Sequence, residues 1–245
     1  MPAEIRIGTS GYSYKHWRGR YYPEDLKSSE WLSHYVRDFD TVELNNTFYQ
    51  LPTEEAFDNW RKSSPVDFVF AVKGSRFLTH MIKLKDPERG LVNFMPRAMR
   101  LKKKLGPVLW QLPPKWNANV ERLEAFLSLL PEKHRYAFEL RNPTWMNEDV
   151  YAVLRRHNAA FCIYELAGHQ SPLEVTADWT YIRLHGPTRF KYQGSYSDEQ
   201  LSEWAARIRS WAKKMKAIYV YFDNDDSAYA VENALTLKRL CAGAG

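Results

Sequence analysis

Charged and amide side chains alternate with apolar ones in several short β-rich runs of the sequence. In the run that starts at Thr41, Glu43 and Asn45 alternate with Val42 and Leu44. Because successive side chains of a strand point to opposite faces, Glu43 and Asn45 share one face and the apolar pair shares the other. Carboxylates and imidazoles transfer protons, whereas guanidinium and ammonium groups bind anions. The pattern therefore indicates a polar site built on strands.

The same alternation selects further candidates in other runs. Four residues have types suited to acid–base catalysis: Glu43, Glu139, His185 and Asp223. By the same alternation, Asn45, Lys73, Arg141 and Arg183 are predicted to contact a ligand, and Gln111 is the polar candidate of the run 107–113, which is apolar on both faces. Tyr192 is predicted to contact a ligand from the loop that follows the run 179–186. In the run Ala159–Leu166 both faces are apolar, and Glu165 is its polar candidate.

The runs that carry these residues alternate with helical patterns along most of the chain. Eight strands are predicted, at 4–10, 41–48, 67–74, 107–113, 135–141, 159–166, 179–186 and 217–224. Helical spacing is seen at 28–39, 53–63, 119–130, 147–158, 197–214 and 228–240, with Asn147 as a helix cap and Ser197 with Gln200 as a capping box. The segment 167–178 is too broken for a regular helix. Strand–helix alternation in 245 residues predicts one α/β domain, residues 1–245, folded as a (β/α)8 barrel.

A barrel would gather the polar set at the carboxyl ends of its strands, where barrel enzymes have their active sites. In the enzyme interpretation, Arg183, Arg141 and Lys73 hold a small anionic ligand such as a phosphorylated sugar or a nucleotide fragment. Glu43 or Glu139 is then the general base, and His185 the proton donor. The structural alternative is a set of internal ion pairs that fill the barrel, for instance Glu139 with Arg183.

Basic residues near the expected barrel mouth support a second function, nucleic-acid binding. The segment 11–22 has Lys15 and Arg18 among five Tyr and Trp residues and has no acid. Such a mixture suits phosphates with stacked bases, or aromatic rings that pack as a lid. Arg76 and Lys83 would extend this rim, whereas the run Lys102–Lys104 is better explained as a solvated helix face.

Composition narrows these alternatives. The net charge of +6 and the pI near 9.1 permit an anionic partner. The two cysteines indicate neither a disulfide framework nor a zinc site, and no apolar run has the length of a membrane span. We expect a cytoplasmic protein without a membrane partner. The first strand has no glycine-rich fingerprint, and nothing supports a nicotinamide or flavin cofactor. No metal site is predicted, because only His185 of the seven His lies at a strand end. Glu43, Glu139 and Asp223 could hold a Mg²⁺ through oxygen ligands, but each has an arginine or lysine that competes nearby, and a metal requirement stays open. The oligomeric state stays open.

Several motifs in the same order resemble the domain of unknown function 72 (YecE-like) family. They are GTSGYSYKHWRGRYYP, VELNNTFYQLP, FVFAVKGSRFLTH, LGPVLWQLPP, FELRNPTW, YIRLHG with YQGSYS, and YVYFDNDDSAYAVENA, between about Ile5 and Leu240. The resemblance implies a barrel of the triosephosphate isomerase type and implies no reaction. It also implies that Asn224, in the last motif, is a ligand-binding residue. Related sequences often have His where this chain has Asn142, so a step that depends on that His would be missing here.

Overall fold

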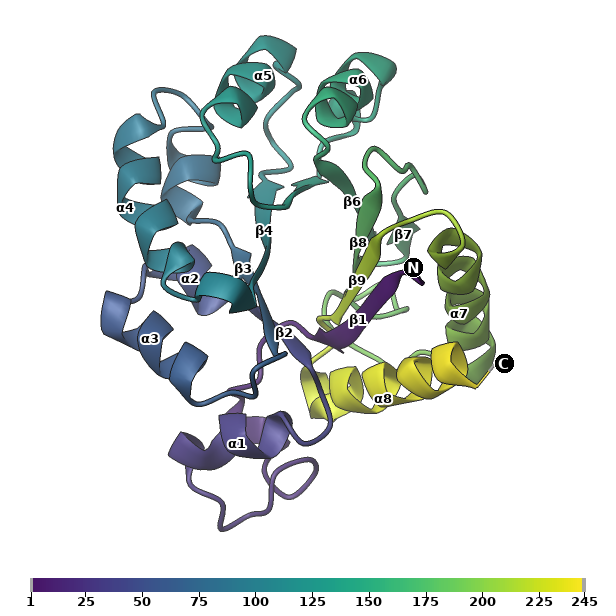
Figure 1. Cartoon of the computed structure of the whole chain (residues 1–245). Helices are drawn as coiled ribbons and strands as arrows, with labels where there is room; N and C mark the ends of the chain where they lie inside the picture. Colours follow the sequence, from purple (N-terminus) through teal and green to yellow (C-terminus); the bar gives the residue numbers. More distant parts are fainter. Residues whose placement is uncertain (1, 244–245) are drawn as a thin grey trace.

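Eight parallel strands form a nearly closed barrel in the computed structural model, which describes residues 2–243 (Figure 1). They are β1 (Glu4–Thr9), β2 (Thr41–Leu44), β3 (Val69–Lys73), β4 (Leu105–Leu112), β5 (Tyr136–Leu140), β6 (Ala160–Leu166), β8 (Trp179–Leu184) and β9 (Ala217–Phe222). The order in the sheet is β1-β9-β8-β6-β5-β4-β3-β2. An isolated bridge between Ser10 and Glu43 joins β1 to β2. The predicted barrel is confirmed.

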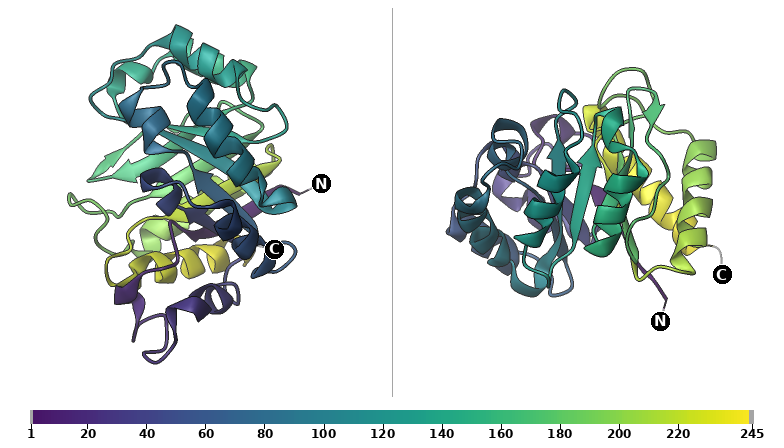
Figure 2. Two further views of the ribbon diagram at one scale, coloured as in Figure 1. Left: turned by 90° about the vertical axis from the view of Figure 1, so that its left-hand side faces the viewer. Right: turned by 90° about the horizontal axis from the view of Figure 1, so that it is seen from above.

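Helices cover the outside of the barrel, as the two side views show (Figure 2). They are α1 (Trp31–Tyr35), α2 (Asn46–Tyr49), α3 (Glu54–Lys62), α4 (Glu88–Met99), α5 (Val120–Ser128), α6 (Glu148–Arg156), α7 (Asp198–Ala212) and α8 (Tyr229–Ala242). Asn147 caps α6 and Ser197 forms a capping box with Gln200 at α7, as predicted. No helix in residues 2–243 is both long and apolar enough to cross a membrane.

Three elements differ from the sequence prediction. The second strand ends at Leu44, because Thr47 Oγ1 hydrogen-bonds the Leu44 carbonyl and starts the helical turn α2. Helix α4 was not among the predicted helices, and only basic residues near it stood out in the sequence. It contains Pro96, and a proline inside a helix makes the sequence pattern less typical of a helix. The segment 167–178 contains a short strand, β7 (His169–Gln170), antiparallel to β6. The Phe161 amide in β6 donates a hydrogen bond to Thr176 Oγ1 at 2.7 Å. This bond ties the segment to the barrel where a crossover helix is absent from the described residues.

The two faces of the strands bury different side chains. Val42, Leu44, Phe138 and Leu140 pack in the large apolar layer between the barrel and its helices. The barrel interior holds a smaller cluster of mostly Ala and Tyr side chains, namely Ala71, Leu109, Ala137, Ala160, Cys162, Trp179, Tyr181, Ala217, Tyr219 and Tyr221. The polar residues that follow these positions on the same faces lie at the carboxyl end of the barrel. The alternation in the sequence therefore sets which side chains reach the interior.

Candidate functional site

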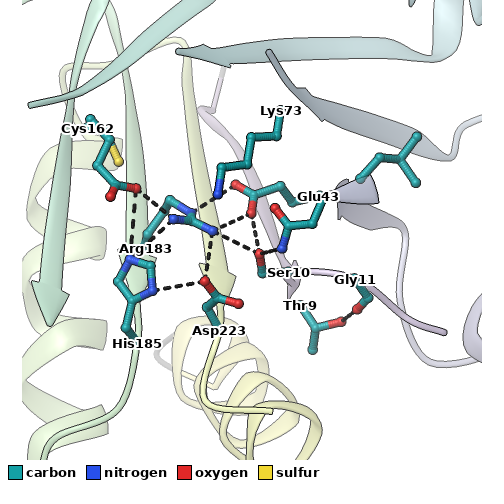
Figure 3. A network of polar contacts seen from close by, with 12 residues as sticks. Thr9, Ser10, Gly11, Glu43, Lys73, Cys162, Arg183, His185 and Asp223 are labelled. Carbon is teal, nitrogen blue, oxygen red and sulfur yellow. Dashed lines mark hydrogen bonds and ion pairs between the residues drawn. The ribbon is translucent and has the colours of Figure 1, made fainter. Parts of the chain in front are cut away.

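Arg183 is the centre of a buried network at the carboxyl end of the strands (Figure 3). Its guanidinium binds Glu43 through Nε and Nη2, at 3.1 and 2.8 Å from Oε2 and Oε1. Nη1 donates to Glu139 Oε2 at 2.6 Å, and Nη2 donates to Asp223 Oδ2 at 2.9 Å and to Ser10 Oγ at 3.0 Å. Arg183, Glu43 and Glu139 have no exposed surface. All three guanidinium nitrogens therefore have partners within the protein.

This network contains the internal ion pair between Glu139 and Arg183 that the structural alternative predicted. Burial alone would lower the pKa of Arg183, but Glu43, Glu139 and Asp223 raise that pKa well above its ordinary value. Burial would likewise raise the pKa of Glu139, yet Arg141 and Arg183 hold it well below its ordinary value. Arg183 lies where a cation shared by the carboxylates would lie. In residues 2–243, no group of three His, Cys, Asp or Glu has the arrangement of a metal site.

His185 lies between two carboxylates of the network and is fully buried. Its Nε2 is 3.3 Å from Arg183 Nη1, and a hydrogen bond between them requires Nε2 as the acceptor, because a guanidinium can only donate. Nδ1 is 2.9 Å from Asp223 Oδ2, without the alignment of a hydrogen bond, and Nε2 is 3.8 Å from Glu139. The exposed ring of Tyr192 stands over His185, with ring centres 5.5 Å apart.

Two residues that the sequence prediction missed complete the network. Ser10 Oγ binds a carboxylate oxygen of Glu43 and accepts a hydrogen bond from Asn45 Nδ2 at 2.5 Å. The Tyr181 hydroxyl donates to Glu43 Oε2 at 2.6 Å. The alternation of β1 and β8 places both residues on the interior face, but serine and tyrosine carry no charge that would have drawn attention to them.

Lys73 points toward the network from the end of β3 (Figure 3). Its amine lies 4.5 Å from the centre of the Phe48 ring and forms no salt bridge with any carboxylate in residues 2–243. Burial, followed by the charge of Arg183, lowers the pKa of Lys73 to about 8. His80 packs edge-on against the same Phe48 ring, and burial with the charges of Arg76 and Lys73 lowers the pKa of His80 to about 4.

Arg141 supplies a second cation with unused hydrogen-bonding capacity. Its Nε donates to Glu139, while its Nη2 is buried and has no hydrogen-bond partner among the described residues. Gln111, on the neighbouring strand and aligned with Glu139, is also almost fully buried at this end. Lys73, Gln111, Arg141 and Asp223 retain some exposed surface, so they form the floor of the barrel mouth.

Other predicted or suggested residues lie outside this floor. Asn224 follows Asp223 and points away from the interior of the barrel. On the outer side its Nδ2 donates to the Gly194 carbonyl and to Asn233 Oδ1. Glu165 is on the outer face of β6. Burial raises its pKa, and the hydrogen bond from Tyr196 offsets only part of this rise. Asn142 caps a single helical turn by accepting from the Thr144 amide at 3.0 Å.

The aromatic segment after β1 is largely packed into the protein. Trp17 and Tyr22 are buried, and Tyr22 stacks on Trp31 at 5.0 Å between ring centres. Of the two interpretations of this segment, packing as a lid describes these rings. Lys15 and Arg18 are exposed beside them. The run Lys102–Lys104 precedes β4 and therefore lies at the opposite end of the barrel from the site.

Comparison with known proteins identifies the family. The family described as "Protein of unknown function DUF72" matches residues 6–244. The UPF0759 protein YecE of Escherichia coli (strain K12) is 32% identical over 113 residues, which cover 46% of this chain but only 42% of YecE. The UPF0759 protein YunF of Bacillus subtilis (strain 168) is 24% identical in an alignment of 277 positions, gaps included, that covers 96% of this chain and 94% of YunF. A DUF72 family crystal structure from Thermotoga maritima has a TM-score of 0.88 at 30% identity, covering 98% of this chain and 99% of that one. The chain belongs to the DUF72 family.

Proposed function

We propose that this DUF72 protein is an enzyme that binds a small phosphorylated ligand at the carboxyl-end mouth of the barrel. The observation that carries the proposal is the buried Nη2 of Arg141, which has no hydrogen-bond partner within residues 2–243 and lies at the same end of the barrel as the Lys73 amine. A buried cationic donor without a partner costs free energy that an anionic ligand would recover. Phosphate oxygens are suitable acceptors for a guanidinium and an ammonium group together.

The carboxylates support acid–base chemistry on such a ligand. Asp223 is the carboxylate of the network with exposed surface, and its pKa is lowered because Arg183 and His185 outweigh the effect of burial. It is therefore ionised at neutral pH and suited to accept a proton from the ligand. Lys73, with a pKa near 8, is suited to bind the phosphate and to return a proton.

The fully buried members of the network have a different role in this proposal. Arg183 binds no ligand directly, since all of its nitrogens have partners, and it holds Glu43, Glu139 and Asp223 in place. His185 lies beside Asp223, with Nδ1 2.9 Å from Oδ2. These residues set the electrostatics of the mouth, whereas Lys73, Arg141, Gln111 and Asp223 meet the ligand, with Tyr192 above them.

Nucleic-acid binding is the alternative, and the exposed Lys15 and Arg18 are the observation in its favour. Base stacking would require free ring faces beside these charges. Because Trp17 and Tyr22 are packed into the protein, we prefer a small ligand over a polymer.

Calorimetric titration with inorganic phosphate, glucose 6-phosphate and ribose 5-phosphate tests the proposal. We compare the wild type with Lys73→Met, and with Lys15→Met as a matched loss of one exposed lysine charge. We expect at least one sugar phosphate to bind with a dissociation constant of about 1 mM or lower. Lys73→Met should weaken binding roughly tenfold or more, and Lys15→Met should leave it unchanged.

Absence of binding for all three anions contradicts the proposal. If none binds, but an oligonucleotide binds in a salt-dependent way and loses affinity in Lys15→Met, the alternative is supported instead.

A further inference from the structure

A cavity of about 430 Å3 lies beside the barrel mouth, between the segment after β1, the start of α2 and helix α3. This volume is in the range of roughly 300–1,000 Å3 that small-molecule sites occupy. Its lining is dominated by four aromatic side chains, Tyr12, Tyr14, Tyr49 and Trp60. None of the residues proposed to hold the phosphate lines this cavity.

Hydrogen bonds within the protein hold three of these rings, Tyr12, Tyr14 and Trp60. Trp60 Nε1 donates to the Tyr12 hydroxyl at 3.0 Å, and the Tyr14 hydroxyl donates to the Ser10 carbonyl at 2.6 Å. Tyr49, in contrast, is 79% exposed and stands at the edge of the cavity. Rigid rings inside the cavity and an exposed ring at its edge suit a flat ligand that Tyr49 can cover.

Asn45 provides one directional polar group to this cavity. Its Nδ2 donates to Ser10 Oγ, which fixes the orientation of the amide. Its Oδ1 is buried and has no hydrogen-bond partner among the described residues. A buried acceptor without a donor is unfavourable, so the ligand is expected to donate a hydrogen bond at this point.

We propose that this cavity binds the flat heteroaromatic ring of a nucleoside-like ligand, with an N–H group of the ring system donating to Asn45 Oδ1. Stacking on tyrosine and tryptophan accounts for the flat ring, and the free acceptor accounts for the N–H group. A plain hydrocarbon ring would leave Asn45 unsatisfied.

The position of α2 relates this cavity to the barrel mouth. Asn46 and Tyr49 line the cavity, while Phe48 in the same helical turn contacts the Lys73 amine. The cavity and the Lys73 amine therefore both adjoin α2, and we expect a phosphate attached to the bound ring to extend toward Lys73. This connection rests on the proposed function, whereas ring binding does not.

Titration with adenosine, guanosine, cytidine and uridine tests the inference without any phosphate. We expect at least one nucleoside to bind with a dissociation constant of about 1 mM or lower. Tyr49→Ala should weaken that binding by roughly tenfold, because it removes one stacking surface. Tyr49→Phe keeps the ring and should retain binding. Leu129→Ala removes an exposed apolar side chain at the other end of the barrel and should have no effect.

A comparison of adenosine with purine riboside, which lacks the exocyclic amine, tests the role of Asn45 if adenosine is among the ligands. The inference is overturned if no nucleoside binds, or if Tyr49→Ala leaves binding unchanged. Nucleoside binding without any gain from a 5′-phosphate supports the inference and contradicts the connection between this cavity and Lys73. Nucleoside binding without binding of any sugar phosphate supports the inference and contradicts the proposed function. Sugar phosphate binding without nucleoside binding supports the proposed function and overturns the inference.

Discussion

Replacing Arg183 with Met tests the energetics of the buried network. The substitution keeps much of the side-chain volume but removes the charge that Glu43, Glu139 and Asp223 share. Removing one partner of a buried ion pair costs about 3–5 kcal/mol, because the other charge stays buried and uncompensated. Three carboxylates are affected here, while Arg141 continues to pair with Glu139.

The loss in the free energy of unfolding should therefore be at least about 3–5 kcal/mol at pH 7. In a chain of this length, that corresponds to a decrease in melting temperature of roughly 6–20 °C. The matched control is Arg156→Met, which breaks the surface ion pair with Glu124. Because that arginine is largely exposed, its loss should cost less than about 1 kcal/mol.

The effect of Arg183→Met should also depend on pH. In the wild type the pKa values of Glu139 and Asp223 are lowered, so their stabilisation exists above the ordinary carboxyl pKa and is lost as the pH falls through the folded values. Without Arg183, burial raises these pKa values, and protonation relieves the cost of the buried charges. The difference between the two proteins should be largest near pH 7 and smaller near pH 5. Urea unfolding at both pH values measures it, and a loss below about 1 kcal/mol at pH 7 would refute the reasoning.

Two further predictions concern single residues. Lys73→Met should raise the free energy of unfolding at pH 7 by up to about 3 kcal/mol, because the lowered pKa means that the folded state disfavours the charged amine. As the pH rises from the folded Lys73 pKa of about 8 toward the ordinary lysine value, the wild type should gain stability, and the difference in unfolding free energy between the two proteins should disappear. Unfolding curves from pH 7 to 10 measure this change. Ser197→Ala removes the capping box of α7 and should lower the unfolding free energy by about 1 kcal/mol in the same assay, whereas Ser197→Thr should keep most of it.

The period of two in the strands made much of the site predictable. Glu43, Lys73, Glu139, Arg183, His185 and Asp223 were placed at the inner carboxyl end from their apolar neighbours alone, and the structure brings them together. The same rule explains Asn224. One residue past Asp223 the side chain points to the opposite face, so the presence of Asn224 in the family motif did not place it at the site.

Pairing within the site could not be predicted in the same way. The enzyme interpretation predicted that Arg183 binds the ligand. The partners of Arg183 in the structure are Glu43, Glu139 and Asp223, and they depend on how β2, β5 and β9 are placed around β8. The aromatic cavity depends on how α2 and α3 pack. Tyr12 and Tyr14 lie in the aromatic segment 11–22 that stood out in the sequence, whereas Trp60 lies in a helical segment without any local signal of a site. Tyr49 lies in the motif VELNNTFYQLP but was not itself predicted.

The central claim is that an anionic ligand binds beside Lys73, and the titration of this amine tests it most directly. Reductive methylation with 13C-formaldehyde labels the lysines, and the Lys73→Met variant identifies the Lys73 resonance. The account predicts a titration midpoint near pH 8 in the free protein, and a higher midpoint when ribose 5-phosphate or another bound sugar phosphate is present, because a nearby anion favours the charged amine. A midpoint at the ordinary lysine value that is the same with and without every sugar phosphate would contradict the claim.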